Sequence, residues 1–533
     1  MSGESDVHEA EEAHEGIKHE ANIIAVDIGT TSLRSHVYDN HGHIKASSSK
    51  KIELIHPKPG WSEMDPELLY KQVVACVDES IKAAGIKVSE VTCLGIAVQR
   101  NTCLTWDSKT GKPFHNFITW QDLRARDYVK SWNTSLTLKA LNSGSKVLHT
   151  FTRKKRFLSA SVLKFMSPQV TLRLLWILDN IPDLRKKALD GEVKFGCIES
   201  WLLWKLTGSQ VHATDFSCAS ATGLYDPFLV SWSTIVCGLV NIPMNIFPDV
   251  LPTSGVFGHV DESVFGSSIP ITCLVGDQSA SMFGECCFDV GDIKCTLGTG
   301  MFIDLNTGEE PHASIAGLYP LIGWKIGNKM TYLAEGAAND AGTVINWAQL
   351  QLGLFEDVRD TASIAESVED TDGVYFVPAF CGLQAPINDD KATTLMIGMT
   401  PSTTKAHLTR AILESIAFRF KLLYETVLSE TKIPLSYIRV DGGVCNNDFL
   451  VQLMADLTNQ VINKSTQTDN MSSLGTAFFA GLAVGVWKDV KELEKIRLTE
   501  REFHPQPTWQ KYKPVFHQWE RAVSRSQKWY EES

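Results

Sequence analysis

The stretch NIIAVDIGTTSLRSHVYD, residues 22–39, decides the fold. An apolar run at residues 23–26 and an alternating run at residues 33–38 predict two strands of a hairpin. Gly29 lies in the turn, where it allows backbone conformations closed to other residues. The carboxylate of Asp27 stands at the mouth of the turn, and the hydroxyls and amides of residues 30–32 can face a phosphate. The alternative for this stretch alone is an ordinary polar hairpin.

The same pattern recurs about 270 residues later, where residues 293–296 and 301–305 flank the turn Gly298-Thr299-Gly300. Two such copies predict duplicated domains that face each other across a cleft. A third strand, residues 438–440, ends in Asp441-Gly442-Gly443, and glycines at a strand-to-helix turn let a nucleotide approach the backbone.

Polar residues follow several predicted strands at their carboxyl ends, where α/β proteins bind ligands. The buried strand at residues 91–98 ends in Gln99 and Arg100, and a solvated loop arginine is the alternative. Asp277 lies between a strand at residues 271–275 and a helix at residues 279–283. A carboxylate there can be a general base, a metal ligand or a helix cap.

The remaining chain is less informative. Asp65 and Pro66 predict the start of a helix, and residues 170–178 and 199–206 have helical patterns. Residues 251–258 have the Pro and Gly content of a linker. The last predicted helix places Trp519 and Trp529 on or near one apolar stripe. Residues 133–166 have no readable pattern.

Length and composition exclude several classes of protein. The chain has 533 residues, which predicts two or three domains, and 44% apolar and 21% charged residues are ordinary for a globular protein. The formal net charge is -12, half of it in the first twenty positions, so no basic face favours nucleic-acid binding. No signal sequence and no membrane span are predicted, which indicates a cytoplasmic protein.

Short features of the sequence leave alternatives open. Residues 1–21 are acidic and are predicted to be disordered, and His8, His14 and His19 are too irregularly spaced to favour a metal site. The basic cluster at residues 153–156 is an anion patch, a nuclear signal or a solvated surface. The 12 cysteines include no CxxC pair, and vicinal Cys286 and Cys287 are expected to be buried thiols rather than a redox pair.

Six motifs in this order resemble the FGGY carbohydrate kinases, a family of the actin-like ATPase superfamily: DIGTTSLR, QRNT, WQD, GDQ, LGTG and DGGVCNN. The segments HPKPGWSEMDP and FVPAFCGLQAP resemble the glycerol kinase branch. The resemblance implies an α/β fold of two actin-like (RNase H-like) domains with a nucleotide and substrate cleft between them. It places these domains at residues 22–286 and 287–533.

The resemblance also implies roles for particular residues. Asp27 would hold Mg²⁺, Asp277 would be the catalytic base, and Arg100 and Gln278 would bind the hydroxyls of a small polyol. The residues that would bind ATP are Thr30, Thr31, Ser32, Arg34, Thr299, Gly342, Asn346, Gly443 and Asn447. Asn346 is the least secure match of these. The implied partners are a small polyol, with glycerol first, and a second copy of the chain in a homo-oligomer.

This chain departs from the glycerol kinase pattern on the acceptor side. It has QRNT where those kinases have QRET, so Asn101 stands in place of a substrate-binding carboxylate. Pro168 or a neighbour replaces a pocket tyrosine, and Ile387 and Asn388 replace an aromatic pair. Each lost hydrogen bond costs about 1–3 kcal/mol.

Three functions are therefore compatible with the sequence. The first is an ATP-dependent polyol kinase that acts on glycerol, and the second is a kinase for another sugar or polyol. The third is a nucleotide-binding regulatory protein with little turnover.

Overall fold

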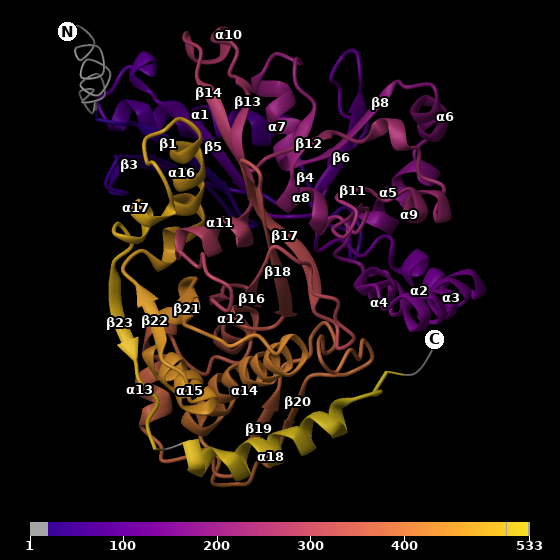
Figure 1. The fold of residues 1–533 in the computed structure, drawn as a ribbon. Coiled ribbons are helices and arrows are strands. Elements are labelled where there is room, and N and C mark those ends of the chain that lie inside the picture. Colours follow the sequence, from indigo (N-terminus) through magenta and orange to yellow (C-terminus); the bar gives the residue numbers. More distant parts are fainter. Residues whose placement is uncertain (1–19, 508, 531–533) are drawn as a thin grey trace, which may run out of the picture.

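The computed structural model describes residues 20–507 and 509–530 (Figure 1). The predicted disorder of the acidic segment and the histidines His8, His14 and His19 therefore fall almost entirely outside the described residues.

The opening stretch forms the predicted hairpin, and it starts the first half of the central sheet. Strands β1 (Ile23–Ile28), β2 (Ser32–Tyr38) and β3 (Ile44–Lys51) are antiparallel neighbours. β5 (Cys93–Val98) and β14 (Pro270–Gly276) then continue the sheet parallel to β1, and β13 (Ser254–His259) is antiparallel to β14.

The second half of the sheet repeats this order, which confirms the internal duplication. β15 (Ile293–Leu297) and β16 (Met301–Gly308) form the second hairpin, followed by β18 (Lys329–Ala338) and β17 (Tyr319–Ile326). On the other side β21 (Ile438–Asp441) and β22 (Ile462–Ser465) are parallel to β15, and β23 (Thr499–Phe503) is the edge.

The linker predicted at residues 251–258 is wrong. Most of this segment belongs to β13, where Ser254 pairs with Ile326 of β17 and joins the two halves into one 13-stranded sheet. Gly255 and Gly258 sit beside a register irregularity, a place in a strand where glycine is tolerated. A prediction from composition alone therefore missed a strand that joins the two halves of the sheet.

Two helices cross between the halves (Figure 1). α11 (Asp277–Gly284) follows β14, and α16 (Met471–Ala483), from the second half, packs near β1 and β5. The backbones approach so closely that a Cβ on Gly475 would lie 1.8 Å from the carbonyl oxygen of Ala280. The Ser281 hydroxyl of α11 also binds the Asp441 carboxylate at the end of β21. The two halves are thus fixed to each other directly beneath the strand ends.

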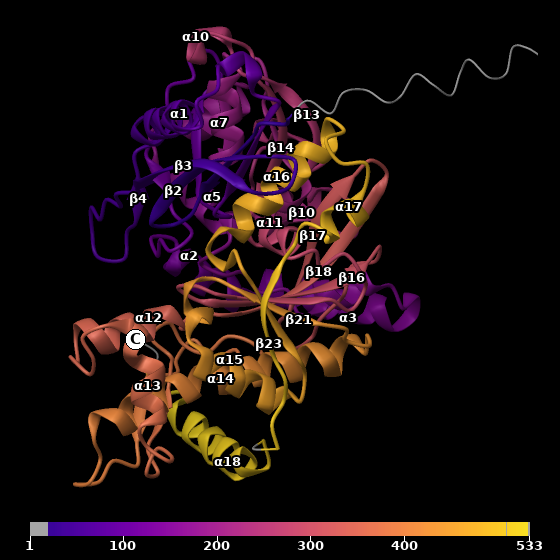
Figure 2. The same ribbon diagram turned by 90° about the vertical axis from the view of Figure 1, so that its left-hand side faces the viewer.

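Helices cover both sheet halves (Figure 2). In the first half α1 (Pro66–Ala83) begins as predicted, with the Asp65 carboxylate accepting from the backbone N–H groups of Glu67 and Leu68. In the second half α18 (Trp509–Ser526) packs Trp519 into the core, where its indole donates to the Phe376 carbonyl. Trp529 lies beyond the helix and is 66% exposed, so its predicted place on the apolar stripe is wrong.

The unreadable segment is helical and forms, with its neighbours, a lobe beside the first half. Its helices are α2 (Arg126–Thr134), α3 (Leu136–Thr152), α4 (Lys155–Ser161) and α5 (Val170–Asn180). A small sheet of β4 (Glu63–Met64), β7 (Phe117–Ile118), β6 (Cys103–Asp107) and β8 (Val193–Cys197) supports it.

The other helices are α6 (Leu184–Leu189), α7 (Ile198–Leu206), α8 (Phe216–Ala221), α9 (Thr234–Leu239), α10 (Glu262–Phe265), α12 (Gly342–Leu350), α13 (Thr361–Glu366), α14 (Lys405–Thr431), α15 (Asp448–Thr458) and α17 (Val490–Glu494). The other strands form three pairs: β9 (Ala213–Asp215) with β12 (Asp249–Leu251), β10 (Tyr225–Asp226) with β11 (Ser231–Trp232), and β19 (Tyr375–Val377) with β20 (Leu395–Ile397).

Two predictions about side chains and membranes can be compared with this fold. Cys286 and Cys287 are buried free thiols, and burial raises the pKa of Cys287 to about 12, as expected for unreactive thiols. Among the described residues, no helix has the length and apolar character that crossing a bilayer requires.

Candidate active site

Three parallel strands of the first half end at one edge of the sheet and bring together residues predicted for the site. Ile28 of β1 pairs with Val98 of β5, and Val98 pairs with Gly276 of β14. The first turn, Arg100 and Asp277 follow these three strands. They therefore meet at the carboxyl edge of the sheet, where parallel sheets bind ligands.

Asp277 stands at the start of α11, but it is not the N-cap. The cap residue is Gly276, and the Asp277 carboxylate accepts from the next backbone N–H, that of Gln278, at 2.8 Å. The Arg100 Nε lies 3.9 Å from Asp277 Oδ1. A Cβ on Gly276 would lie 2.9 Å from the Arg100 side chain, so glycine is what lets the arginine pass to the carboxylate. Burial raises the pKa of Asp277, and Arg100 opposes this shift.

Asp27 faces the same region from β1. Burial and the negative charge of Asp277 raise the pKa of Asp27 to about 7, and Arg34, its cross-strand neighbour, lowers it. Two carboxylates that repel each other in a buried site are an arrangement that a divalent cation relieves. The described residues contain no cluster of three metal-binding side chains. A Mg²⁺ held by one carboxylate, with water and phosphate as its other ligands, fits this donor set.

The first turn is fixed by Gln99, which lies at one of the predicted strand ends, and by Trp120, the first residue of the WQD motif. The Thr30 hydroxyl donates to Gln99 Oε1 and accepts from the Trp120 indole N–H, both at 3.2 Å. Gln99 also donates to the Gly29 carbonyl at 3.0 Å. Thr31 is exposed and Ser32 is half-buried, which leaves their hydroxyls at the surface of the turn.

The second turn lies against α12, the helix that carries Gly342 and Asn346, two residues predicted to bind ATP. The Gly342 N–H donates to the Gly298 carbonyl at 2.9 Å, and a Cβ on Gly342 would lie 2.6 Å from that oxygen. The Thr299 carbonyl accepts from the backbone and hydroxyl of Thr343. Asn346 is exposed on α12, one helical turn beyond Gly342. Gly342, Asn346 and Thr299 are therefore neighbours.

The third glycine turn packs against the second turn within the second half, close to a contact with the first half. Gly442 has φ +87°, and a Cβ there would lie 2.6 Å from the Leu297 carbonyl, so only glycine fits beside the second turn. Next to it, Gly443 has open space: the nearest atom to a Cβ would be an Asp469 carboxylate oxygen at 3.8 Å. The carbonyl of Asp469 accepts from Arg34 Nη1 at 2.7 Å. Arg34 thus connects the first turn to the second half of the chain.

Asn447 has a local structural role. It is the N-cap of α15, where its side-chain oxygen accepts from the Leu450 N–H and its amide donates to the Thr361 hydroxyl. Both ends of this side chain are therefore occupied, so any contact between Asn447 and a nucleotide would have to share or replace one of these bonds.

The acceptor side of the site contains an unsatisfied polar atom. Asn101 has φ 66°, a left-handed conformation that asparagine tolerates better than most residues. Its Oδ1 is buried and has no hydrogen-bond partner among the described residues. The Asn101 carbonyl accepts from Arg173 at 2.6 Å, and so does the Pro168 carbonyl at 2.8 Å. Arg173 therefore fixes both positions at which the chain departs from the glycerol kinase pattern near the acceptor.

A buried charge network beneath Arg100 was missed by sequence reasoning. Arg100 Nη2 donates to Glu335 Oε2 of β18 at 2.5 Å. The fully buried Lys294 of β15 lies 2.9 Å from Asp304 and donates to the side-chain oxygen of Gln278 at 2.8 Å. The Gln278 amide N–H group is then the part that can face a ligand. A lysine inside an apolar strand was the available signal, because such residues are rarely buried without a partner.

The other acceptor-side substitutions are structural. Asn388 donates to the Ala316 carbonyl at 2.8 Å, and Ile387 packs on the core of the second half. The phenol of Tyr319, a β17 residue paired with Glu335, contacts the Met166 sulfur close to Pro168. A tyrosine from the opposite half therefore lies near the place of the missing pocket tyrosine.

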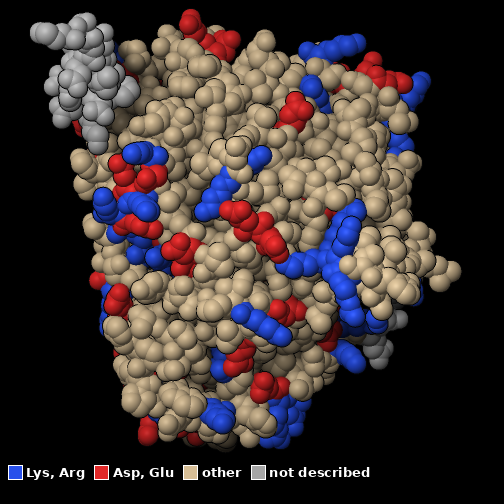
Figure 3. Space-filling model, in the orientation of Figure 1, with Lys and Arg blue, Asp and Glu red and all other residues tan. Residues whose placement is uncertain are grey.

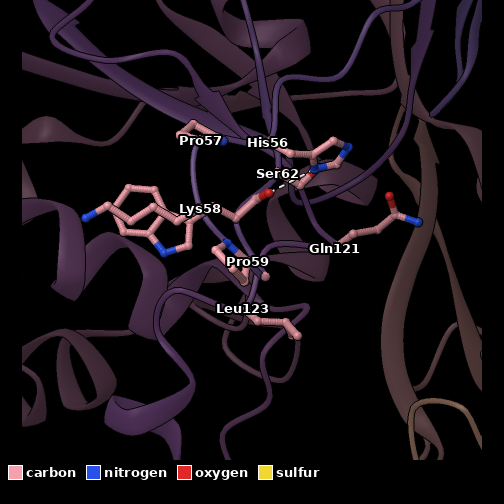
Figure 4. A pocket seen from close by; sticks show the side chains of 9 residues that line it. His56, Pro57, Lys58, Pro59, Ser62, Gln121 and Leu123 are labelled. Atoms are coloured by element: carbon pink, nitrogen blue, oxygen red, sulfur yellow. Dashed lines mark hydrogen bonds between the residues drawn. The ribbon is translucent and has the colours of Figure 1, made fainter.

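A surface pocket of about 510 Å³ lies outside this site (Figure 4). The loop of residues 56–62 arches beside Gln121 and Leu123 and lines it. The guanidinium carbon of Arg124 lies 3.9 Å from the Trp61 ring centroid, which stiffens the loop. None of the predicted catalytic or nucleotide-binding residues lines this pocket.

Comparisons with known proteins agree with this fold. Residues 22–284 match the N-terminal domain, and residues 293–484 the C-terminal domain, of the FGGY family of carbohydrate kinases. Glycerol kinase 5 of Danio rerio is 52% identical over 96% of this chain and 98% of its own length. Glycerol kinase 5 of Homo sapiens is 50% identical over 95% and 96%. The crystal structure of Plasmodium falciparum glycerol kinase with ADP superposes with a TM-score of 0.85 at 32% identity, covering 95% of this chain and 98% of that one.

Proposed function

Because the chain belongs to the FGGY family of carbohydrate kinases, which phosphorylate an alcohol group of a sugar or polyol with ATP, we propose a finer assignment. The chain transfers the γ-phosphoryl group of ATP to a hydroxyl of a small polyol, with glycerol as the first candidate and Asp277 as general base. The names of its relatives support glycerol, and the ADP in the similar Plasmodium structure supports the adenine nucleotide.

The observation that carries the proposal is the position of Asp277. This carboxylate lies 3.9 Å from Arg100 and is repelled by the charge of Asp27, at the carboxyl edge of β1, β5 and β14. In the reaction a polyol oxygen attacks the γ-phosphorus, the bond to the β–γ bridging oxygen breaks, and ADP leaves. The polyol proton passes to Asp277, and burial strengthens this base because it raises the pKa of the carboxyl.

The chain's own groups would position the two substrates. Thr30, Thr31, Ser32 and Thr299 offer hydroxyl and amide donors to the phosphates, and Arg34 offers a positive charge next to them. Gly342, Gly443, Asn346 and Asn447 would border the adenosine. Asp27 would hold Mg²⁺, which when bound neutralises charge on the β- and γ-phosphates.

Glycerol is the first candidate acceptor, and a second candidate follows from Asn101. Its unpartnered Oδ1 can accept from a polyol hydroxyl, while Arg100 and the Gln278 amide donate to others. An amide also donates, which a carboxylate does not, so a sugar or polyol with an accepting oxygen at this position is the second candidate. The third candidate, a regulatory protein with little turnover, is disfavoured because the chain retains Asp277.

Three further predictions belong to this proposal. The repeated sheet order supports division into functional domains at residues 22–286 and 287–533. A cytoplasmic location and a homo-oligomer remain predictions, to be checked by fractionation and light scattering.

The test is ADP release across a panel of glycerol, dihydroxyacetone, tetritols and pentoses. Glycerol should stimulate release, and Asp277→Asn should lower kcat by about 10²–10⁴-fold while ATP binding persists. Asp289→Asn is the matched control, because it replaces an exposed carboxylate that lies beyond the end of α11. This variant should behave as wild type. Stronger turnover of another acceptor would identify that compound, instead of glycerol, as the substrate. ATP binding without acceptor-stimulated ADP release would favour the regulatory protein.

A further inference from the structure

The lobe formed by α2, α3 and α4 has a charge pattern unlike the rest of the chain. Residues 128–178 contain no Asp or Glu in 51 positions, but they contain nine Lys or Arg, in a chain of formal net charge -12. Figure 1 shows these helices grouped at one flank of the molecule, away from the crossing of α11 and α16. Of these nine, Arg173 is buried on α5, and Lys155 and Arg156 pair with Glu310 and Asp226, so the positive charge of the lobe comes from the remaining side chains.

One face of α3 is apolar and exposed. Leu136 and Phe151, at its two ends, are each 83% exposed, and Val147 is 55% exposed. With Ala140, also exposed, these positions fall within about 60° around the helix axis, because each residue turns by about 100°. They form a stripe about 22 Å long. The opposite face packs inward through Leu138 and through Asn142, which donates to the Leu163 carbonyl.

A row of basic side chains borders this stripe. Lys139 and Lys146 are spaced by seven residues, which places them on one line along the helix, and Arg153 follows as the residue that caps its C-terminus. All three are exposed, and none has a carboxylate partner among the described residues. Figure 3 shows the result on this flank: a largely uncharged projection with Lys and Arg gathered beside it.

We propose that the exposed face of α3 docks the protein on a membrane surface rich in anionic phospholipid. An interfacial helix combines an apolar face with flanking Lys and Arg, and its side chains enter the boundary between headgroups and acyl chains. The basic row would contact the phosphate and carboxylate groups of the lipids. The stripe would insert Leu136, Val147 and Phe151 beneath them.

The pattern favours a lipid surface over a second copy of the chain. A symmetric dimer through this face would bring two basic rows together without a carboxylate on α3 to separate them. This flank also projects from the molecule (Figure 3) rather than forming a groove, and a fluid bilayer can adapt to a projection. The helix does not span the bilayer in this proposal, because it lies parallel to the surface.

The test is flotation of the full chain with vesicles of phosphatidylcholine alone or with about 30% phosphatidylserine. Wild type should float with the anionic vesicles, not with neutral ones, and less at high salt. The variant Lys139→Gln/Lys146→Gln/Arg153→Gln should bind on the order of 100-fold more weakly, at roughly fivefold per side chain. Val147→Ser/Phe151→Ser should lose binding although its charge is unchanged.

Matched controls separate this face from general charge and hydrophobicity. Lys488→Gln/Lys491→Gln/Lys495→Gln removes the same charge from an exposed region near α17, and Leu189→Ser/Ile235→Ser removes exposed apolar side chains elsewhere. Both should float as wild type. The proposal is overturned if no variant differs from wild type, if wild type ignores anionic vesicles, or if light scattering shows a dimer that Val147→Ser/Phe151→Ser dissociates.

Discussion

Replacing Arg173 by methionine should damage the acceptor site and leave the nucleotide site intact. Arg173 is fully buried on α5, and its guanidinium donates to five carbonyl oxygens, those of Asn101, Ile118, Thr119, Pro168 and Gln169. No other described side chain connects these three segments in this way. Burial lowers the pKa of Arg173, because removing the charged guanidinium from water costs free energy. The five hydrogen bonds offset this desolvation cost.

The size of the effect follows from which oxygens lose their donor. The carbonyls of Asn101 and Pro168 lie in turns, outside the helices and strands, so Arg173→Met removes the donor from two partly buried acceptors. Each acceptor that loses its donor costs about 1–3 kcal/mol, and removing the buried guanidinium recovers part of this cost. We therefore expect the free energy of unfolding to fall by about 2–4 kcal/mol. The Asn101 turn should also loosen, which should raise the KM for the polyol by about 10–100-fold.

The assay combines urea unfolding with ADP release at varied polyol and varied ATP. The KM for ATP should change less than about threefold, because no nucleotide-side residue touches Arg173. Arg173→Lys keeps one charged donor group and should recover part of the polyol affinity. Arg185→Met, on α6, removes a partly exposed ion pair with Asp179 and is the control. A stable Arg173→Met protein with unchanged polyol KM, or with equal losses for both substrates, would refute this reasoning.

Three further predictions concern single side chains. Glu335→Gln should let Arg100 turn fully to the Asp277 carboxylate and lower the pKa of that carboxyl. Because Asp277 is the proposed base, kcat should fall about tenfold and the acid limb of its pH profile should move to lower pH, so an unmoved limb contradicts the coupling. Burial holds the pKa of His36 at about 4, below its unfolded value of 6.5, so this residue's contribution to stability is complete above pH 6.5 and is lost as the pH falls towards 4. His36→Gln should therefore remove about 2 kcal/mol of the loss in unfolding free energy between pH 7.5 and 5, and an unchanged pH dependence would exclude this role. Asn101→Glu should lower the KM for glycerol about tenfold relative to that for dihydroxyacetone, since it restores a second accepting oxygen, and equal changes for both would disprove the assignment.

The hairpins could be predicted from the sequence because their signals are local. Alternating apolar residues, a turn glycine and a carboxylate at the strand end define the first turn within eighteen residues, and the second copy at Thr299 has the same form. The position of Asp277 between strand and helix was predictable for the same reason. Even there, the geometry differs in detail, since Gly276 takes the cap position and leaves the carboxylate free to face Arg100.

The contacts between the halves could not be predicted, because no local pattern pairs them. Arg34 meets Asp469 from 435 positions away, and Arg100 meets Glu335 from 235. The opposite error occurred at β13, where local composition indicated a linker and the strand is stabilised by pairing with β14 and β17. Local signals therefore identified the pieces of the site, and the fold determined which pieces face each other.

The acceptor pocket shows how one substitution changes the electrostatics of such a site. Arg100 lies between two carboxylates, Glu335 at 2.5 Å and Asp277 at 3.9 Å. A glutamate at position 101 would add a third negative charge next to this group, and with Asn101 the sum of these ionised side chains is only -1. The pocket then attracts a proton or a cation less strongly than it would with a glutamate at position 101, so this substitution does not add to the proton affinity of Asp277. The amide also offers a donor that a carboxylate lacks. The substitution therefore leaves Arg100, Glu335 and Asp277 in place and changes the donors and acceptors of the pocket, so under the proposed function its effect should be seen in acceptor preference rather than in the use of ATP.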